Sequence, residues 1–121
     1  MAVILIVEDE IFVRELAGMF LEDWGHTALF AGSVDEALVV LKSGAPIDAL
    51  FTDIYLKKAV FGGSDLAREA MTLRPDLRVL YTTGNRATDE LRSLFVLGSH
   101  FLGKPYTPHQ LQTSVDGLLQ A

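Results

Sequence analysis

The stretch VILIVEDE, residues 3–10, joins a run of five apolar residues directly to three acidic ones. Four further short runs rich in β-branched or aromatic residues follow along the chain, at Thr27–Ala31, Ala49–Thr52, Val79–Thr82 and His100–Leu102. Short, nearly continuous apolar runs are typical of strands that are buried on both faces of a parallel sheet. The fold therefore depends on what connects these runs.

Segments with helical periodicity alternate with the apolar runs. The first places Val13, Ala17 and Leu21 in one row and Leu16 and Phe20 in the next. The other four run from Ser33 to Gly44 with Glu36 in the capping-box position, from Ser64 to just before Pro75, after Asn85 with Leu91, Leu94 and Phe95, and from Thr107-Pro108 with Leu111, Val115 and Leu118. A strand–helix unit repeated in this way predicts an α/β fold, a doubly wound five-stranded parallel sheet with helices on both faces.

Composition excludes several classes of protein. A chain of 121 residues predicts a single domain over 1–121. The net charge of −6 and the scattered Lys and Arg residues argue against direct DNA binding. No apolar run is long enough to span a membrane, so we expect no membrane association and a cytoplasmic location. The absence of cysteine excludes disulfides and thiolate chemistry.

Polar residues gather where the predicted strands end. Glu8, Asp9 and Glu10 follow the first strand, and Asp53 follows the third. The fourth and fifth strands are followed by Thr83-Gly84 and Lys104-Pro105. Because the carboxyl ends of parallel strands meet at one edge, where open α/β sheets bind their ligands, these residues form the candidate site.

The chemistry of this group points to phosphoryl transfer. Each pair of carboxylates about 4–5 Å apart repels by roughly 3–4 kcal/mol at an effective dielectric constant near 20, so the group needs a compensating cation. Oxygen donors without His or Cys suit Mg²⁺. A carboxylate nucleophile (Asp53), a magnesium ion, a lysine (Lys104) and a hydroxyl donor (Thr83) together could transfer a phosphoryl group and form an aspartyl phosphate.

The motifs Val7-Glu8-Asp9, Asp53, Thr83-Gly84 and Lys104-Pro105 resemble the signature of response-regulator receiver domains, in order and spacing, over the whole chain. The resemblance implies a flavodoxin-like sheet with strand order 2-1-3-4-5. The segments LYTTGN (80–85) and FLGKPY (101–106) are similar to stand-alone receivers of alphaproteobacteria.

The resemblance also implies a role for each residue that matches the motif. Asp53 would be the phosphoacceptor, and Mg²⁺ would be held by Glu8, Asp9, Asp53 and the backbone carbonyl of Tyr55. Lys104 and Thr83 would contact the phosphoryl group, and Phe101 would occupy the aromatic switch position. The Lys104–Pro105 peptide bond would be cis.

The function implied is a phosphorylation switch of a two-component or phosphorelay system. A histidine kinase or a histidine phosphotransfer protein would supply the phosphoryl group, and the chain would promote only its own phosphorylation and dephosphorylation. The new charge would change the face formed by the fourth helix, the fifth strand and the fifth helix, which would bind a downstream protein. The sequence leaves open whether phosphorylation also produces a homodimer.

Departures from the family pattern keep other interpretations open. Lys57 replaces a proline, and the loop from Ile54 to Gly63 is about two residues longer than usual, with Gly62-Gly63 interpreted as loop flexibility. A degenerate receiver that acts as a constitutive binding module is one alternative. An Asp-nucleophile phosphatase is another, although Tyr55 stands where that class carries a second acid. A flavodoxin-like cofactor binder is disfavoured, because without a metal the acidic first loop would repel a phosphate.

Overall fold

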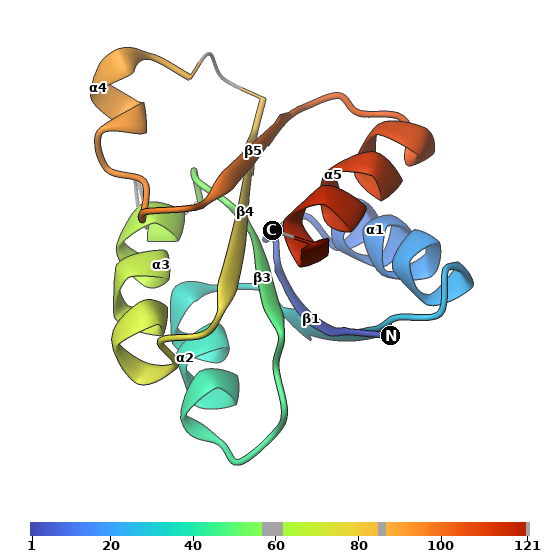
Figure 1. The fold of residues 1–121 in the computed structure, drawn as a ribbon, viewed down its shortest axis with the longest axis horizontal. Coiled ribbons are helices and arrows are strands. Elements are labelled where there is room, and N and C mark those ends of the chain that lie inside the picture. The colour runs from blue at the N-terminus through green and yellow to red at the C-terminus, as the bar shows by residue number, and fades with distance from the viewer. Residues whose placement is uncertain (57–61, 85–86, 121) are drawn as a thin grey trace.

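The computed structural model describes residues 1–56, 62–84 and 87–120, and Figure 1 shows their arrangement. The elements are β1 (Val3–Val7), α1 (Ile11–Asp23), β2 (Thr27–Ala31), α2 (Val34–Lys42), β3 (Ala49–Asp53), α3 (Gly62–Leu73), β4 (Arg78–Thr83), α4 (Asp89–Arg92), β5 (His100–Gly103) and α5 (Pro108–Gln120). Within these ranges no helix has the length and apolarity needed to cross a membrane. The strand–helix alternation predicted from the sequence is confirmed.

All neighbouring strands run parallel, in the order β2-β1-β3-β4-β5. This order places β1 between β2 and β3, so the chain adds β2 on one side of β1 and then reverses direction to add β3, β4 and β5 on the other side. The predicted flavodoxin-like topology is therefore confirmed. Its consequence is that the ends of β1 and β3 are neighbours at the carboxyl edge of the sheet, where the winding reverses.

Two apolar layers cover the sheet. On one face, alternate strand residues such as Ile6, Phe51 and Leu80 pack against α1 and α5. On the other face, Leu50 and Tyr81 belong to the cluster that packs against α2, α3 and α4. Figure 1 shows this division, with α1 and α5 on one side of the strands and α2, α3 and α4 on the other. Burial on both faces explains why the strand sequences are almost entirely apolar.

The predicted starts of two helices have the expected capping bonds. The Ser33 side chain accepts a hydrogen bond from the backbone N–H of Glu36 at the start of α2. At the start of α5, Thr107 Oγ1 accepts from the N–H of Gln110, and the Gln110 side chain accepts from the N–H of Thr107. These reciprocal bonds satisfy N–H groups that have no partner within the helix.

The fourth helix is shorter than predicted. The sequence pattern places Leu91, Leu94 and Phe95 in one helix, but α4 is 4 residues long and ends at Arg92. The N–H of Val96 instead donates to the Tyr81 hydroxyl at 3.0 Å, and the Phe95 ring stacks on the Tyr81 ring with centroids 4.2 Å apart. Tertiary contacts with β4 therefore replace further helical turns, which periodicity alone could not reveal.

The interpretation of Gly62-Gly63 as flexible loop is wrong. Both residues belong to the first turn of α3 and are buried. A Cβ atom on Gly63 would lie 2.0 Å from the carbonyl oxygen of Asp53, and the Gly63 N–H donates to the carbonyl of Ile54 at 3.0 Å. Glycine is needed because α3 approaches the end of β3 at backbone distance. The departure at Lys57 and half of the long loop, residues 57–61, lie outside the described residues, as does Asn85.

Candidate functional site

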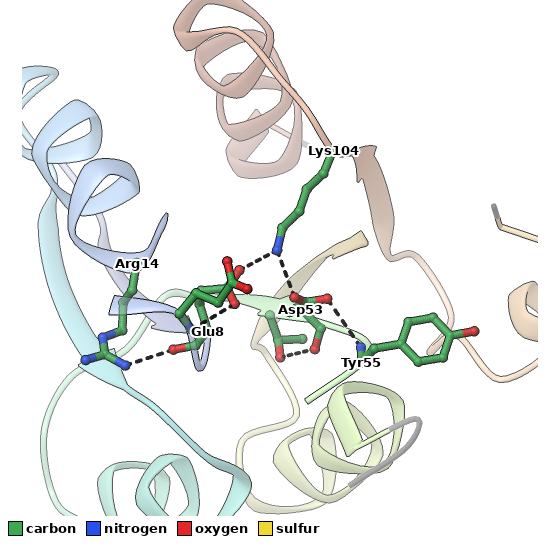
Figure 2. A network of polar contacts seen from close by, with 7 residues as sticks. Glu8, Arg14, Asp53, Tyr55 and Lys104 are labelled. Carbon is green, nitrogen blue, oxygen red and sulfur yellow. Dashed lines mark hydrogen bonds and ion pairs between the residues drawn. The ribbon is translucent and has the colours of Figure 1, made fainter. Parts of the chain in front are cut away.

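Glu8 is the first residue after β1 and is buried, with 4% of its surface exposed. Its N–H donates to the carbonyl of Ala31 at 3.1 Å, which extends the pairing of β1 with β2 by one residue. Its Oε2 accepts from the N–H of Glu10 at 3.2 Å. Its carbonyl oxygen accepts from Arg14 Nη1 at 2.8 Å. The backbone of Glu8 and one of its carboxylate oxygens are therefore held in place. The other oxygen, Oε1, points toward the carboxyl edge of the sheet (Figure 2).

Asp53 ends β3 and is also buried, with 7% exposed. Its Oδ1 accepts from the N–H of Tyr55 at 3.3 Å. The backbone at this point is fixed by the N–H of Ile54, which donates to the carbonyl of Thr82 at 2.9 Å, and by the close approach of Gly63. The carboxylate is thus carried by a rigid strand end, which is how sites that need exact placement are built.

Lys104 lies just beyond β5 and reaches both acids. Its Nζ is 2.8 Å from Asp53 Oδ2 and forms a second ion pair with Glu8 Oε1. Figure 2 shows the ammonium group between the two carboxylates. Its backbone N–H donates to the carbonyl of Thr83 at 2.9 Å, which anchors the lysine to the end of β4. We call Glu8, Asp53 and Lys104 the acidic edge.

Burial and charge act against each other at the acidic edge. Burial raises the pKa of Glu8 above its ordinary 4.5, and the Asp53 charge adds to this, while Lys104 opposes both. Burial alone would lower the pKa of Lys104, but its hydrogen bonds to Asp53 and Glu8 outweigh burial and raise it above 10.5. One ammonium therefore serves two carboxylates, and the group keeps an excess of negative charge that a further cation would offset.

The predicted magnesium ligands come together only in part. The Glu8 and Asp53 carboxylates both contact the Lys104 ammonium. Asp9 is half-buried in the loop after β1. In the part of the chain that the structure describes, no three His, Cys, Asp or Glu side chains are grouped to hold a metal. Mg²⁺ commonly takes one or two carboxylates and completes its shell with water and phosphate oxygens, so the donors present fit this ion. The predicted metal-binding roles of Glu8, Asp9, Asp53 and the Tyr55 carbonyl all stay predictions.

The remaining predicted residues lie around the acidic edge. Thr83 ends β4 and is 1% exposed. Phe101 lies in β5 and is half-buried. Its ring stacks on Phe95 with centroids 6.0 Å apart, and Arg92 lies 5.3 Å from its centroid. We call Tyr81, Phe95, Phe101 and the covering Arg92 the aromatic column. The Lys104–Pro105 bond is cis.

Sequence reasoning missed two features near the site. Arg14, whose guanidinium holds the Glu8 carbonyl, also lies 2.8 Å from where a Cβ of Gly32 would be, so it fills the space beside the turn after β2. Its only sequence signal was an arginine in the second turn of an otherwise apolar helix start. The second feature is a groove of about 420 Å³ between α1 and the segment after β5, lined by Leu16, Phe20, Lys104 and Tyr106 among others.

Tyr106 separates this groove from the core. Its ring packs against Phe51 at a centroid distance of 6.1 Å. Burial raises the pKa of Tyr106 to about 12, so its hydroxyl stays protonated beside the acids at neutral pH.

A larger hollow of about 500 Å³ lies at the opposite edge of the sheet and is lined by Asp48, Arg74 and Arg78. Arg74 donates to the carbonyls of Leu41 and Ser43, and Arg78 donates to the carbonyl of Leu118. Its charged groups therefore tie secondary-structure elements together, and the chemistry of the molecule is concentrated at the carboxyl edge.

Comparison with known proteins agrees with this geometry. A protein-family model described as response regulator receiver domain matches residues 4–116. Among solved structures, a response regulator receiver protein from Sinorhizobium medicae WSM419 is 35% identical, with a TM-score of 0.90, over 99% of this chain and 95% of that one. A CheY-like receiver domain protein from Methanospirillum hungatei JF-1 is 23% identical and superposes with a TM-score of 0.88, over 99% of this chain and 94% of that one, which supports the fold.

Curated relatives contain the matching region as one part of a longer protein. The chain is 31% identical over 121 residues to the sensor kinase CckA of Brucella abortus. This alignment covers 98% of this chain and 13% of that protein. The chain is also 31% identical over 123 residues to the phosphate regulon transcriptional regulatory protein PhoB of Klebsiella pneumoniae, over 97% of this chain and 51% of that protein. The chain thus spans about half or less of the curated relatives it matches.

Proposed function

This chain belongs to the family of response regulator receiver domains of two-component signalling, and we propose that it is a switch turned on by transfer of a phosphoryl group to Asp53. The observation that carries the proposal is the position of Lys104, whose ammonium is bonded to both buried carboxylates at the acidic edge. A lysine without a role at this site would be expected to extend into solvent and not to contact two buried carboxylates. The arrangement supports chemistry in which negative charge arrives next to Asp53.

In the proposed reaction a carboxylate oxygen of Asp53 attacks the phosphorus of a phosphohistidine. The new O–P bond forms as the N–P bond to the histidine breaks, and the imidazole leaves with its electron pair. Lys104, already 2.8 Å from Asp53 Oδ2, would follow the charge onto the phosphoryl oxygens. The backbone N–H of Tyr55 holds the other carboxylate oxygen at 3.3 Å and so orients the nucleophile.

The metal that we propose for this site is Mg²⁺, held by Asp53, Asp9, Glu8 (directly or through water) and the Tyr55 carbonyl. When bound, Mg²⁺ would neutralise charge on the phosphoryl oxygens. The two buried carboxylates share one ammonium, and this shortage of positive charge supports the proposal. Asp9 lies directly after Glu8 in the same loop, so a small change there would add a third oxygen donor.

The phosphodonor that we propose is a histidine kinase or a phosphotransfer protein that docks on α1. The apolar groove beside α1 opens next to Lys104, so a protein seated there would present its histidine to Asp53. Phe12, Leu16 and Met19 of α1 are 86%, 50% and 59% exposed, and they follow the i, i+4, i+7 spacing of a helix-docking surface. Apolar side chains exposed together in this way mark interaction sites.

The output that we propose passes through Thr83 and the aromatic column. A phosphoryl group adds about −1.5 to −2 of charge and new acceptor oxygens beside Thr83. If Thr83 moves toward these oxygens, Phe101 gains space to leave its contacts with Phe95 and Arg92. The face formed by α4, β5 and α5 would then change its affinity for a downstream protein. This is a population shift between two states rather than a new activity toward a substrate.

The experiment that tests the proposed function is intact-protein mass after incubation with acetyl phosphate and Mg²⁺. We expect a gain of one phosphoryl group that is lost in Asp53→Asn and in the presence of EDTA. Phosphorylation that persists in Asp53→Asn would overturn the assignment of the acceptor. No phosphorylation by acetyl phosphate or by a phosphohistidine donor, together with no Mg²⁺ binding, would favour a constitutive binding module.

A further inference from the structure

A second threonine at the end of β4 carries a hydroxyl that the proposed function does not use. In the pairing of β3 with β4, Thr82 lies opposite Asp53, and opposite residues in neighbouring strands point to the same face of the sheet. Thr82 therefore lies beside Asp53 on the face covered by α1 and α5. Thr83 follows it in the strand and points to the other face, so the two hydroxyls serve different surroundings.

The Thr82 hydroxyl is buried without a partner. Thr82 is 4% exposed, and its Oγ1 has no hydrogen-bond partner among the described residues. Buried polar atoms in native proteins almost always bond to the protein or to ordered water, so each exception requires an explanation. A valine would fill the same volume without leaving a hydroxyl unbonded.

A cavity of the size of one water molecule lies beside Thr82. Its volume is about 10 Å³, and its lining includes Thr82, Glu8 and Tyr106 together with apolar side chains of β1, β3 and α1. A volume of about 10–15 Å³ is the least that holds one water, which also needs at least two polar partners. The cavity therefore has the size for a single water and polar groups on its wall.

Glu8 has the capacity to be the second partner. Its Oε1 is bonded to Lys104, and its Oε2 accepts from the N–H of Glu10. A carboxylate has about four acceptor positions, so these two bonds leave room for a further donor. Lys104 approaches the carboxylate from the segment after β5, and a water in the cavity would approach from the side of the core.

We propose that this cavity binds one water molecule that bridges the Thr82 hydroxyl and the Glu8 carboxylate, which makes Thr82 a positioning residue for Glu8. The water satisfies the Thr82 hydroxyl and fixes the Glu8 side chain from the side of the core. Lys104 holds the same side chain from the segment after β5. Thr82 acts through the water and Glu8, and does not touch the phosphoryl group. The presence of the water does not depend on the proposed function. The expected effect of a fixed Glu8 on Mg²⁺ affinity does rest on the proposed function.

The chain offers a matched set of variants. Thr82→Val removes the hydroxyl and keeps the β-branched shape that suits a strand. Thr82→Ser keeps the hydroxyl and loses a methyl group. Ser64→Ala removes the other buried hydroxyl without a partner in the described part of the chain. Ser64 lies in α3, which packs on the opposite face of the sheet, so this variant controls for loss of a buried hydroxyl elsewhere.

The first measurement is a high-resolution crystal structure of the metal-free protein and of the Thr82 variants. We expect an ordered water within hydrogen-bonding distance of residue 82 and Glu8 in the wild type and in Thr82→Ser. In Thr82→Val we expect no water and a Glu8 side chain that turns or splits into two conformers. A wild-type cavity without water would overturn the proposal, and a Glu8 that stays unmoved in Thr82→Val would overturn the positioning role.

The second measurement is a calorimetric titration with Mg²⁺ of the same proteins. We expect Thr82→Val to bind Mg²⁺ about three- to tenfold more weakly than the wild type. Loss of a residue that bonds directly to a metal ligand lowers metal affinity by about tenfold or more, and Thr82 acts through a water, so the effect should be smaller. Thr82→Ser and Ser64→Ala should bind as the wild type does. Wild-type affinity in Thr82→Val would overturn the positioning role. A wild type that binds no Mg²⁺ would instead refute the metal part of the proposed function, while the crystallographic result would still decide the proposal about the water.

Discussion

The acidic edge and the aromatic column lie at the same end of the sheet but are held together by opposite kinds of interaction. At the acidic edge, one lysine from the segment after β5 joins two carboxylates from β1 and β3 by ion pairs. In the aromatic column, three rings from β4, β5 and the connection between α4 and β5 stack on one another. The first region therefore depends on charge and pH, and the second depends mainly on how the rings pack.

The largest effect is expected at the backbone that supports the acidic edge. Gly63→Ala should lower the free energy of unfolding by about 3 kcal/mol, because the new Cβ would lie 2.0 Å from the Asp53 carbonyl oxygen. Urea denaturation measures the change. Gly117→Ala is the matched control, since Gly117 is a helical glycine of α5 with nothing within 4 Å of its Cβ position. It should stabilise the protein by about 0.5–1 kcal/mol. A Gly63→Ala variant as stable as the control would contradict the close approach.

The next effect tests the charge balance of the acidic edge. Lys104→Met should destabilise the protein by about 2 kcal/mol at pH 7 in metal-free buffer, since it leaves two buried carboxylates without their shared cation. This is less than for a fully buried pair because the Lys104 side chain is 21% exposed. Denaturant unfolding with and without Mg²⁺ measures it. Equal stability of variant and wild type in metal-free buffer would show that Lys104 is not needed to offset the two acids.

The same variant should have a characteristic pH dependence. Burial already raises the pKa of Glu8 above 4.5, and Lys104 is the main influence that lowers it. Removing Lys104 raises the folded-state pKa of Glu8 further, so the variant loses more stability than the wild type as the pH rises above 4.5. The difference between the two proteins should shrink as the pH falls from 7 toward 4.5. A difference that stays constant over this range would contradict the electrostatic explanation.

A smaller effect, independent of pH, is expected in the aromatic column. Tyr81→Phe keeps the ring that stacks on Phe95 but removes the hydroxyl that accepts from the Val96 N–H at 3.0 Å. Loss of this partly buried bond should cost about 1 kcal/mol. Burial raises the pKa of Tyr81 above 10, so the cost should be the same at pH 5 and pH 8. Stability measured at both pH values checks this, and a pH-dependent cost would link the column to the acidic edge.

The smallest effect is expected at the exposed end of the column. Arg92→Ala removes a cation that lies 5.3 Å from the Phe101 ring centroid and should cost about 0.5 kcal/mol. Arg68→Ala is the control, because Arg68 forms a half-exposed ion pair with Asp65 inside α3. We expect the Phe101 ring resonances to shift in NMR spectra of Arg92→Ala and to stay unchanged in Arg68→Ala. Unchanged Phe101 resonances in both variants would show that Arg92 does not hold the ring.

The comparison also explains where sequence reasoning succeeded. Short apolar runs of three to five residues predicted the strands, and the polar residues that follow four of them predicted their shared edge. The strand order implied by the family resemblance is confirmed. The acids and the lysine could be placed together from topology, because parallel strands end at one edge.

Sequence reasoning failed where one segment's conformation depends on a distant one. Gly62-Gly63 looked like a flexible loop, but the Asp53 carbonyl requires a glycine there. Leu94 and Phe95 continued a helical pattern, but Tyr81 takes the N–H of Val96 and ends the regular structure. Nothing in the sequence distinguishes Thr82 from other strand residues, because the cavity beside it is formed together with Glu8 and Tyr106 from distant segments.

The sequence by itself determined the alternation of strands and helices, the parallel sheet and the set of polar residues at its carboxyl edge. These follow from local propensity and from the periodicity of apolar residues, which are properties of short stretches of chain. Only the tertiary structure decided that Lys104 pairs with Glu8 as well as with Asp53, that Gly63 abuts β3 and that Phe101 contacts both Phe95 and Arg92. Each of these depends on atoms from segments far apart in the chain, whose separation is set by packing across the whole sheet.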